Sequence, residues 1–432
     1  MTFTLGIRRE DKNKWERRVP LTPEHLRELK EKYGVETIIQ PSKIRTFSDK
    51  DFEDLGVVIN EDLSSSSVVF AIKEIPIDFF EPGKTYVFFS HTIKGQKYNM
   101  PMLKKMMELG CNLIDYEKIT DEKGRRLVFF GRFAGFAGMI DTLWAFGQRM
   151  KWKGIETPFS EIRQTIHYKD LDEAKLHFEE VGNRIKQEGL PDPLIPFVVG
   201  FAGYGNVSKG AQKILDILPM EEISPKQLKA IGENPSDRVI YKVVFKEEDM
   251  VEPLSAEKEF DLQEYYTQPN LYRSVFQQYI KYLTVLMNCI YWDKQYPRLI
   301  TKEFMKKNYS SNSTLQVIGD ISVDINGAIE FTEKATSPDK PIFVYNHLSG
   351  KIIDGYVGSG IVVMAVDNLP CELPKESSRK FSDSLFRFIP PIVKADFSVD
   401  FDNLDLPPEI KKAVILHHGK LTPDYRYMNK FL

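Results

Sequence analysis

The sequence has few cysteines, no excess of positive charge and no long hydrophobic run. Its three cysteines, Cys111, Cys289 and Cys371, lie far apart. Neither a disulfide framework nor a zinc site is therefore expected, and we predict free thiols in a reducing compartment. The net charge of −3 comes without a basic stripe, which argues against a nucleic-acid partner. No segment reaches the ~18 apolar residues of a membrane helix. The first expected strand begins at Thr2, which leaves no targeting peptide, so we expect a cytoplasmic protein.

The rest of the composition indicates a globular protein with two domains. Hydrophobic residues make up 42% and charged residues 28% of 432 residues, which is ordinary for a soluble protein too long for one core. Thr22 and Pro23 predict the N-cap and first turn of a helix. Strands are expected at 35–40, 68–72, 85–89 and 112–116, and again at 239–245, 314–319, 341–345 and 361–366. This alternation predicts parallel sheets covered by helices.

A glycine turn lies at 203–208, between an apolar strand at 196–202 and the start of a helix. This layout places a dinucleotide pyrophosphate on a helix N-terminus. Gly203 would make the tight turn, and Gly205 would let the backbone approach the phosphates. Ser208 stands where the usual fingerprint has a third glycine. Glycine turns of this kind also occur in strand–helix connections that bind nothing.

We therefore predict an α/β fold of two Rossmann-like domains, with parallel sheets flanked by helices and a cleft between the domains. Residues 1–145 would form the substrate domain, completed by a helical tail at 370–432. Residues 146–369 would form the dinucleotide-binding domain. The segment 131–150 is expected to be a long helix that joins the two domains, and 247–270 an excursion outside the second sheet.

Two ionisable residues follow strands of the first expected sheet. Lys73 comes after the strand at 68–72, and His91 after the strand at 85–89. Ligands of α/β sheets bind beyond the carboxyl ends of the strands, so both side chains would face one cleft. A desolvated lysine and a histidine suit acid–base work at a carbon–nitrogen bond. The alternative is that each side chain caps a strand end.

Three further positions carry candidate chemistry. Arg18, before the helix at Thr22, would hold a substrate carboxylate by a two-pronged hydrogen bond, or belong to a solvated charge cluster. Asp320 and Asp324 follow the strand at 314–319, and Asn368 follows the strand at 361–366. One or both aspartates would face the nicotinamide; the alternative is a turn-forming role.

Several of these segments resemble a known family. Residues 16–23, with the sequence ERRVPLTP, resemble the N-terminal signature of the alanine dehydrogenase, transhydrogenase and lysine-forming saccharopine dehydrogenase superfamily. Segments 88–96, 113–118, 205–211 and 366–370 look like the lysine–2-oxoglutarate reductase half of bifunctional aminoadipic semialdehyde synthases. The resemblance covers nearly the whole chain, as far as 423–427. The sequence ends where the saccharopine-oxidising half of those proteins would begin.

The resemblance implies a reaction, its cofactor and its site residues. Lysine would condense with 2-oxoglutarate, and hydride from a nicotinamide cofactor would reduce the imine to saccharopine. In this resemblance Lys73 and His91 match the family's acid–base pair, and Arg18 matches an arginine near the substrate carboxylates. Glu74, which is next to Lys73, would tune the charge of Lys73. Asp324 matches an active-site aspartate and Asn368 a nicotinamide-side asparagine. The cofactor-binding set would be Gly203, Gly205, Asn206, Val207, Ser208, Asp320 and Asn368.

The identity of the cofactor and of the partners is less constrained. The resemblance favours NADP(H), but Glu221 and Glu222 lie near the expected ribose-binding position and would repel a 2′-phosphate, so NAD(H) stays open. Lys226 and Lys229 are close enough in sequence to compensate. Expected partners are lysine, 2-oxoglutarate and saccharopine, with a possible homo-oligomer and a separate saccharopine-oxidising enzyme. The alternatives are another amino-acid dehydrogenase, such as one for alanine, and a non-catalytic nucleotide-binding sensor.

Overall fold

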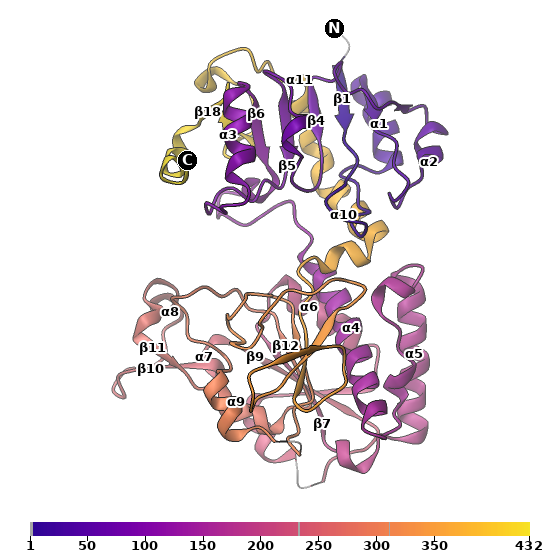
Figure 1. Cartoon of the computed structure of the whole chain (residues 1–432), viewed down its shortest axis with the longest axis vertical. Coiled ribbons are helices and arrows are strands. Elements are labelled where there is room, and N and C mark those ends of the chain that lie inside the picture. Colours follow the sequence, from indigo (N-terminus) through magenta and orange to yellow (C-terminus); the bar gives the residue numbers. More distant parts are fainter. Residues whose placement is uncertain (1–2, 232–233, 311) are drawn as a thin grey trace. The chain divides into compact units, whose positions relative to one another are not determined.

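The protein consists of two compact units. The computed structural model describes residues 3–231, 234–310 and 312–432. Unit 1 comprises the chain up to Phe130 together with Pro374–Leu432, and unit 2 comprises Gly131–Leu373. Each unit is built around one large sheet with its own hydrophobic core (Figure 1).

The sheet of unit 1 has eight strands in the order β18-β17-β6-β5-β4-β1-β2-β3. Its six N-terminal strands are all parallel, whereas β17 and β18 from the C-terminal tail are antiparallel to their neighbours. The strand bounds are β1 Phe3–Ile7, β2 Val35–Ile39, β3 Val58–Ile59, β4 Val68–Phe70, β5 Thr85–Phe88, β6 Asn112–Asp115, β17 Val414–His417 and β18 Lys420–Leu421. The chain order reverses between β1 and β4, and that point is where open α/β sheets bind ligands.

Helices of unit 1 begin where the sequence places caps. Thr22 caps α1 (Pro23–Tyr33) with Pro23 in its first turn, and Ser48 caps α2 (Asp49–Glu53). The tail returns to this unit, with its orange and yellow ribbon among the first strands in Figure 1. The other helices are α3 Met100–Glu108, α10 Pro374–Leu385, α11 Ile389–Lys394 and α12 Pro408–Lys411. The tail was predicted to be helical, and the strands β17 and β18 within it were missed.

The sheet of unit 2 has the order β15-β14-β16-β13-β12-β7-β9-β8. Six strands are parallel, while β14 and β15 are antiparallel. The bounds are β7 Phe197–Ala202, β8 Met220–Ile223, β9 Ile240–Phe245, β12 Val285–Asn288, β13 Val317–Asp320, β14 Ile342–Tyr345, β15 Ile352–Asp354 and β16 Ile361–Met364. The sheet is therefore mostly parallel, as predicted, and β14 with β15 adds an antiparallel edge to it.

The helices of unit 2 are dominated by α4 (Gly131–Trp152), which packs on α6, β13 and β16. All of α4 lies in unit 2, so a boundary at residue 145 would cut through a packed helix. The others are α5 Leu171–Glu188, α6 Asn206–Leu215, α7 Glu247–Met250, α8 Leu262–Thr267 and α9 Lys302–Asn308. The segment expected to leave the sheet does so, and its strand β10 (Val251–Pro253) pairs only with β11 (Tyr272–Ser274).

A carboxyl pair is buried where α4 meets the segment after β16. The side chains of Asp141 and Glu372 are both buried, and the two carboxyls interact electrostatically. Asp141 also accepts hydrogen bonds from the Thr165 amide at 2.7 Å and hydroxyl at 2.9 Å. Burial, together with the charge of Asp141, raises the pKa of Glu372 well above its usual range. Burial therefore favours the protonated form of Glu372 in the folded protein.

This pair predicts that the free energy of unfolding falls as the pH rises through the weakly acidic and neutral range. A carboxyl whose folded pKa lies above its unfolded value binds its proton more tightly in the folded state. The free energy of unfolding therefore decreases as pH rises above about 4.5, up to the folded pKa. Thermal unfolding of Glu372→Gln should show a smaller loss between pH 6 and pH 8 than wild type, by about 1 kcal/mol or more. Equal losses in both proteins would contradict a raised pKa of Glu372 in the folded state.

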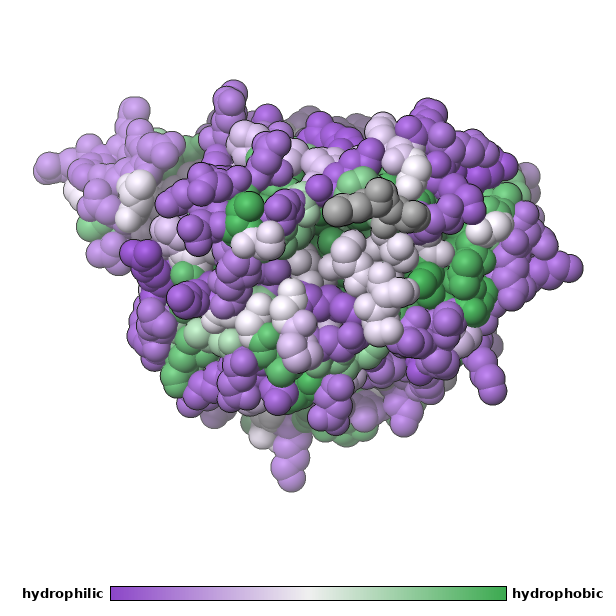
Figure 2. All heavy atoms as spheres, turned by 90° about the horizontal axis from the view of Figure 1, so that it is seen from above, coloured by the Kyte–Doolittle hydropathy of each residue, from purple (hydrophilic) through white to green (hydrophobic). Residues whose placement is uncertain are grey.

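The surface shows no dominant apolar face in the view of Figure 2, where hydrophilic side chains prevail and hydrophobic ones form separate patches. Within the ranges that the structure describes, no helix is both long and apolar enough to cross a membrane.

Candidate functional site

One candidate site lies at the switch point of the unit 1 sheet. Glu10 follows β1, and its carboxylate accepts hydrogen bonds from the backbone amides of Ile72, at 2.5 Å, and Lys73, at 3.0 Å. Burial, with the nearby charge of Glu16, raises the pKa of Glu10 to about 7. Glu10 therefore fixes the chain after β4 and sets the direction in which the Lys73 side chain leaves the sheet.

Lys73 is a partly buried cation. Burial and the charge of Arg18 lower the pKa of its ammonium, against the opposing effect of Glu16. No carboxylate lies within ion-pair distance of its Nζ among the described residues. A lysine in this state gives up its proton more readily than a solvated one, which suits it to accept a proton from a substrate.

Glu74 joins His91 and Lys12 in one hydrogen-bonded group. The Glu74 Oε1 lies 2.7 Å from the His91 Nδ1, and Lys12 Nζ donates to the same carboxylate at 2.9 and 3.1 Å. Burial alone would raise the pKa of Glu74, but the bonds to His91 and Lys12 hold it well below its usual range. Because this carboxylate stays ionised, it orients the His91 ring and leaves Nε2 for a ligand. Glu74 is thus a positioning residue for His91.

The loop that carries His91 is held in a specific conformation. His91 has a φ of 47°, in the left-handed region that non-glycine residues rarely adopt. The Asn99 Nδ2 donates to the carbonyl oxygens of Ser90, at 3.0 Å, and His91, at 3.3 Å. From the C-terminal tail, the Tyr427 hydroxyl donates to the Ile93 carbonyl at 2.7 Å. Local strain of this kind is kept only where the surroundings enforce it.

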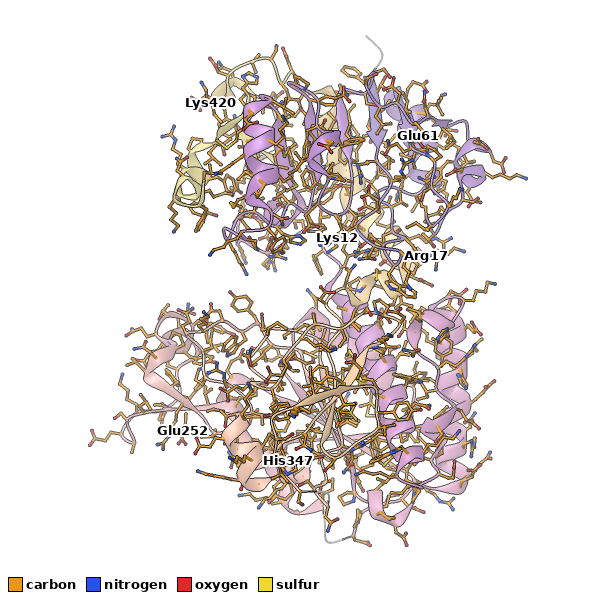
Figure 3. All side chains as sticks on the ribbon, in the orientation of Figure 1. Lys12, Arg17, Glu61, Glu252, His347 and Lys420 are labelled. Atoms are coloured by element: carbon orange, nitrogen blue, oxygen red, sulfur yellow. The ribbon has the colours of Figure 1, made fainter. Side chains whose placement is uncertain are left out.

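The Arg18 side chain forms an ion pair with Glu16. Its Nε and Nη2 donate to the two carboxylate oxygens of Glu16, at 2.7 and 2.6 Å, and its guanidinium lies over the Phe130 ring. Arg18 and Glu16 are both buried, so the solvated-cluster alternative is wrong for Arg18. Arg17 is exposed, and Figure 3 labels it with Lys12 at the lower edge of unit 1. Glu16 thus accepts the two-pronged hydrogen bond of Arg18. The positive charge of Arg18 lowers the pKa of Lys73.

A separate candidate site in unit 2 is the glycine turn. Gly203 has a φ of 92° and follows β7, and α6 begins at Asn206. The first helical hydrogen bond runs from the Lys209 amide to Gly205, so the amides of Asn206, Val207 and Ser208 have no intrahelical acceptor. A Cβ at Gly205 would meet nothing within 4 Å. Donors and open space together fit a phosphate group.

Close helix packing in this motif depends on Gly210 rather than on Ser208. A Cβ on Gly210 would lie 2.2 Å from the Arg132 carbonyl oxygen, and a Cβ on Gly135 would lie 2.0 Å from that of Val207. The two glycines let α6 and α4 touch backbone to backbone. Ser208 is buried, and its Oγ accepts a hydrogen bond from Gln212 at 2.9 Å. The missing third glycine of the fingerprint is therefore supplied two residues later.

Asp320 and Asp324 differ in their surroundings. Asp320 is buried at the end of β13, where its carboxylate accepts hydrogen bonds from Asn288, at 2.8 Å, and the Thr332 hydroxyl, at 2.6 Å. Burial raises its pKa to about 6. Its predicted cofactor contact is not supported, because these partners occupy it. Asp324 is only partly buried, in a loop where Val323 has a φ of 52°. Asp320 thus anchors the loop that presents Asp324.

The predicted cofactor residues share one edge of the unit 2 sheet. The glycine turn follows β7, Asp324 follows β13 and Asn368 follows β16, and these strands are parallel members of one sheet. Asn368 is partly buried and opens a 3-10 turn at Leu369–Glu372. Neither here nor elsewhere among the residues that the structure describes do three His, Cys, Asp or Glu side chains gather as metal ligands would.

The two glutamates that weighed against a 2′-phosphate lie away from that edge. The order β7-β9-β8 puts β8 two strands from β7. Glu222 of β8 is in register with Lys242 of β9, and Lys242 is in register with Val199 of β7. Val199 lies about 10 Å before the carboxyl end of β7. The Glu222 carboxylate forms a 2.8 Å ion pair with Lys242. The expectation that Glu221 and Glu222 approach the ribose is therefore wrong, because β9 inserts between their strand and β7.

The position next to the glycine turn belongs to the end of β9. The Gly203 amide donates to the Phe245 carbonyl at 3.0 Å, and Lys246 and Glu247 follow. Glu247 accepts a hydrogen bond from the Tyr266 hydroxyl at 2.7 Å, while Lys246 is exposed. Lys226 and Lys229, the two lysines expected to compensate for the glutamates, have different surroundings. The charge of Lys226 favours the ionised form of Asp249, which follows β9. Lys229 lines a cavity at the opposite edge of the sheet.

Sequence reasoning missed the residues that support the candidate site. Glu10, Lys12 and Glu16 come from the charged segment after β1, and Asn99 precedes α3. One signal was available, because a charged segment directly after the first strand of a parallel sheet falls at the ligand-binding edge. Their pairing with Lys73, Glu74 and Arg18 required the tertiary structure.

Comparison with known families agrees with this architecture. The model of the alanine dehydrogenase/PNT N-terminal domain matches residues 6–137, and the C-terminal domain model of the same family matches residues 271–424. The chain belongs to the alanine dehydrogenase/PNT family. Among family members of known three-dimensional structure, it is similar to an L-alanine dehydrogenase with a TM-score of 0.64 and 16% identity, covering 99% of this chain and 100% of that one. A transhydrogenase from Sinorhizobium meliloti gives a TM-score of 0.56 at 13% identity, covering 98% of this chain and 100% of that one. These likenesses show the fold.

Curated relatives are more similar in sequence to this family member. An alpha-aminoadipic semialdehyde synthase of Arabidopsis thaliana is 38% identical over 98% of the chain, and one of Bos taurus is 35% identical over 99%. The chain spans 41% and 47% of the length of these two relatives. A saccharopine dehydrogenase [NAD(+), L-lysine-forming] of Emericella nidulans is 24% identical and covers 86% of this chain and 87% of that one.

Proposed function

We propose that this chain catalyses the reductive condensation of L-lysine with 2-oxoglutarate to saccharopine, or its reverse. The observation that carries the proposal is the pairing of a desolvated Lys73 with the Glu74–His91 couple at the switch point of unit 1. The similarity of almost the entire chain to aminoadipic semialdehyde synthases supports the choice of substrates.

The residues of unit 1 handle the protons of this reaction. The ε-nitrogen of lysine attacks the keto carbon, water leaves, and the resulting imine carbon receives a hydride. Lys73, in its neutral form, takes the proton that the attacking ammonium group must lose. The His91 Nε2 donates a proton to the hydroxyl group that departs as water. Glu74 holds the His91 ring in place for this transfer through the hydrogen bond to Nδ1.

The residues of unit 2 fit a nicotinamide dinucleotide. Gly203 and Gly205 give the backbone access, and the free amides at the start of α6 would hold the pyrophosphate. Asp324 and Asn368 lie at the same sheet edge and would orient the nicotinamide. The cofactor supplies the hydride.

Lys246 is proposed to select NADPH. It is the first residue after the strand that neighbours β7, and its exposed ammonium would meet a 2′-phosphate. Lys246→Ala should raise KM for NADPH by about 5–10-fold, because one phosphate contact is lost. KM for NADH should change less than twofold. Initial rates with both cofactors measure this, and Glu222→Ala is the matched control. If the ratio of KM for NADPH to KM for NADH were unchanged, Lys246 would have no part in selecting NADPH.

The activity itself is tested by following nicotinamide absorbance with paired substrates. With lysine and 2-oxoglutarate together, the protein should oxidise NADPH, and either substrate alone should give only background. Ammonia with pyruvate tests the alternative of an alanine dehydrogenase. Cofactor binding without turnover on any amine and keto acid would favour the nucleotide-binding sensor instead.

A further inference from the structure

Unit 2 has a cavity of about 760 Å³ at the edge of its sheet opposite to the glycine turn. Pro196, Thr284 and Gln316 line it, and each lies directly before one of the parallel strands β7, β12 and β13. The length of β7, about 20 Å for six residues, separates this edge from Gly203. The volume is that of a small-molecule site, and the cavity is distinct from the site proposed above.

Three lysines from separate elements give this cavity a positive charge. Lys153 follows α4, Lys229 ends a 3-10 helix at Pro225–Lys229, and Lys281 lies in another at Phe276–Tyr282. None of the described residues that line the cavity is acidic. Lys229 and Lys281 are exposed, whereas Lys153 is half-buried. Lys153 thus lies deeper in the wall than the other two.

Lys153 and its neighbour Arg149 lack an anionic partner in the described structure. The Lys153 Nζ donates to the neutral amide oxygen of Gln316 at 2.6 Å, and burial together with Arg149 lowers its pKa. Arg149 is buried and donates to three carbonyl oxygens, those of Tyr356, Gly358 and Gly360. Two cations one turn apart are therefore desolvated and repel each other, an arrangement that a bound anion would stabilise.

A second hollow of about 590 Å³ adjoins the first. The two linings have Lys229, Lys281 and Tyr282 in common, together with Asn312, Ser313 and Thr314, so the exposed lysines stand between the two hollows. Ile155, Leu194 and Pro196 form an apolar wall on the side of the first hollow, and the hydroxyls of Thr284 and Thr314 lie in the same lining. This combination of an apolar wall with convergent cations is typical of a site for an organic anion.

We propose that this cavity binds a small organic polyanion, with carboxylate or phosphate groups held by Lys153, Lys229 and Lys281 and an apolar portion against Leu194 and Pro196. The site is independent of the proposed reaction, since it shares no residue with the glycine turn or with Lys73 and His91.

Calorimetric titration of the full chain at low ionic strength tests this site, with citrate and inorganic pyrophosphate as probes. Saturable binding of one molecule per chain is expected. Lys229→Gln combined with Lys281→Gln should weaken it at least about tenfold, since two charges are removed from the anion. Lys186→Gln with Lys213→Gln removes two exposed lysines of the same unit outside the cavity, and should leave the affinity within about twofold.

The outcomes separate the two kinds of anion and the failure of the idea. Binding of citrate alone assigns a carboxylate ligand, and binding of pyrophosphate alone assigns a phosphate ligand. The proposal would be overturned if neither probe showed saturable binding up to about 10 mM. A Kd above that concentration corresponds to a binding free energy of less than about 3 kcal/mol. Equal weakening in both variant pairs would also overturn it, because it would mean that only net charge matters.

Discussion

Lys73→Met combined with His91→Asn is expected to lower kcat for lysine plus 2-oxoglutarate by at least about 10³-fold, since each proton-transfer group typically contributes 10²–10⁴-fold. The two effects should not multiply, because the residues act in one sequence of transfers. Asn is chosen at position 91 because it tolerates the left-handed conformation that His91 adopts. Steady-state absorbance measurements give the rate.

Two controls make this result specific to acid–base chemistry. NADPH binding, followed by its fluorescence, should be retained, because the glycine turn belongs to unit 2. Lys104→Met removes an exposed charge of the same unit and should leave kcat unchanged. A double variant with wild-type turnover would exclude both residues from the chemistry.

The same assignment predicts the direction of the pH profile. A general base must be unprotonated, so kcat/KM should rise with pH through the lowered pKa of Lys73. In Lys73→Met this limb should be absent from whatever residual activity is measured. If the pH profile of Lys73→Met kept the shape of the wild-type profile, a group other than Lys73 would be responsible for the rise of kcat/KM with pH.

Gly135→Ala is expected to destabilise unit 2 by about 3 kcal/mol or more, at the upper end of overpacking costs, because the clash is with backbone. The added Cβ would lie 2.0 Å from the Val207 carbonyl oxygen and 2.6 Å from the Ala211 amide nitrogen. Neither atom can turn away as a side chain would, so α4 and α6 must separate. Urea denaturation and thermal melting measure the loss.

Gly205→Ala is the matched control for that substitution. It adds the same methyl group in the same motif, but nothing lies within 4 Å, and the φ of −74° suits alanine. Its stability should fall by less than about 1 kcal/mol, the scale of a helix-cap change. NADPH affinity should fall clearly, because the methyl group enters the space proposed for the phosphates. Equal stability losses at Gly135 and Gly205 would contradict the close-packing account.

The sequence was informative where a local rule decides the structure. Thr22 and Pro23 specify a helix start by capping chemistry alone, and Gly203 marks a turn that other residues rarely allow. Lys73 and His91 were found because each follows an apolar strand at a parallel edge. Strand β12 (Val285–Asn288) was missed because no glycine or proline close to either end marks its bounds.

The amino-acid sequence by itself determined the α/β class, the main helices and strands, the glycine turn and the candidate acid–base residues, because these depend on capping, periodicity and chain order. The tertiary structure alone decided that β9 inserts beside β7, which moves the ribose question from Glu221 and Glu222 to Lys246. It alone paired His91 with Glu74 and Gly210 with Gly135. Strand order, ion pairing and backbone contact join residues far apart in the chain, and such contacts are set by the competition of whole surfaces for burial rather than by any local signal.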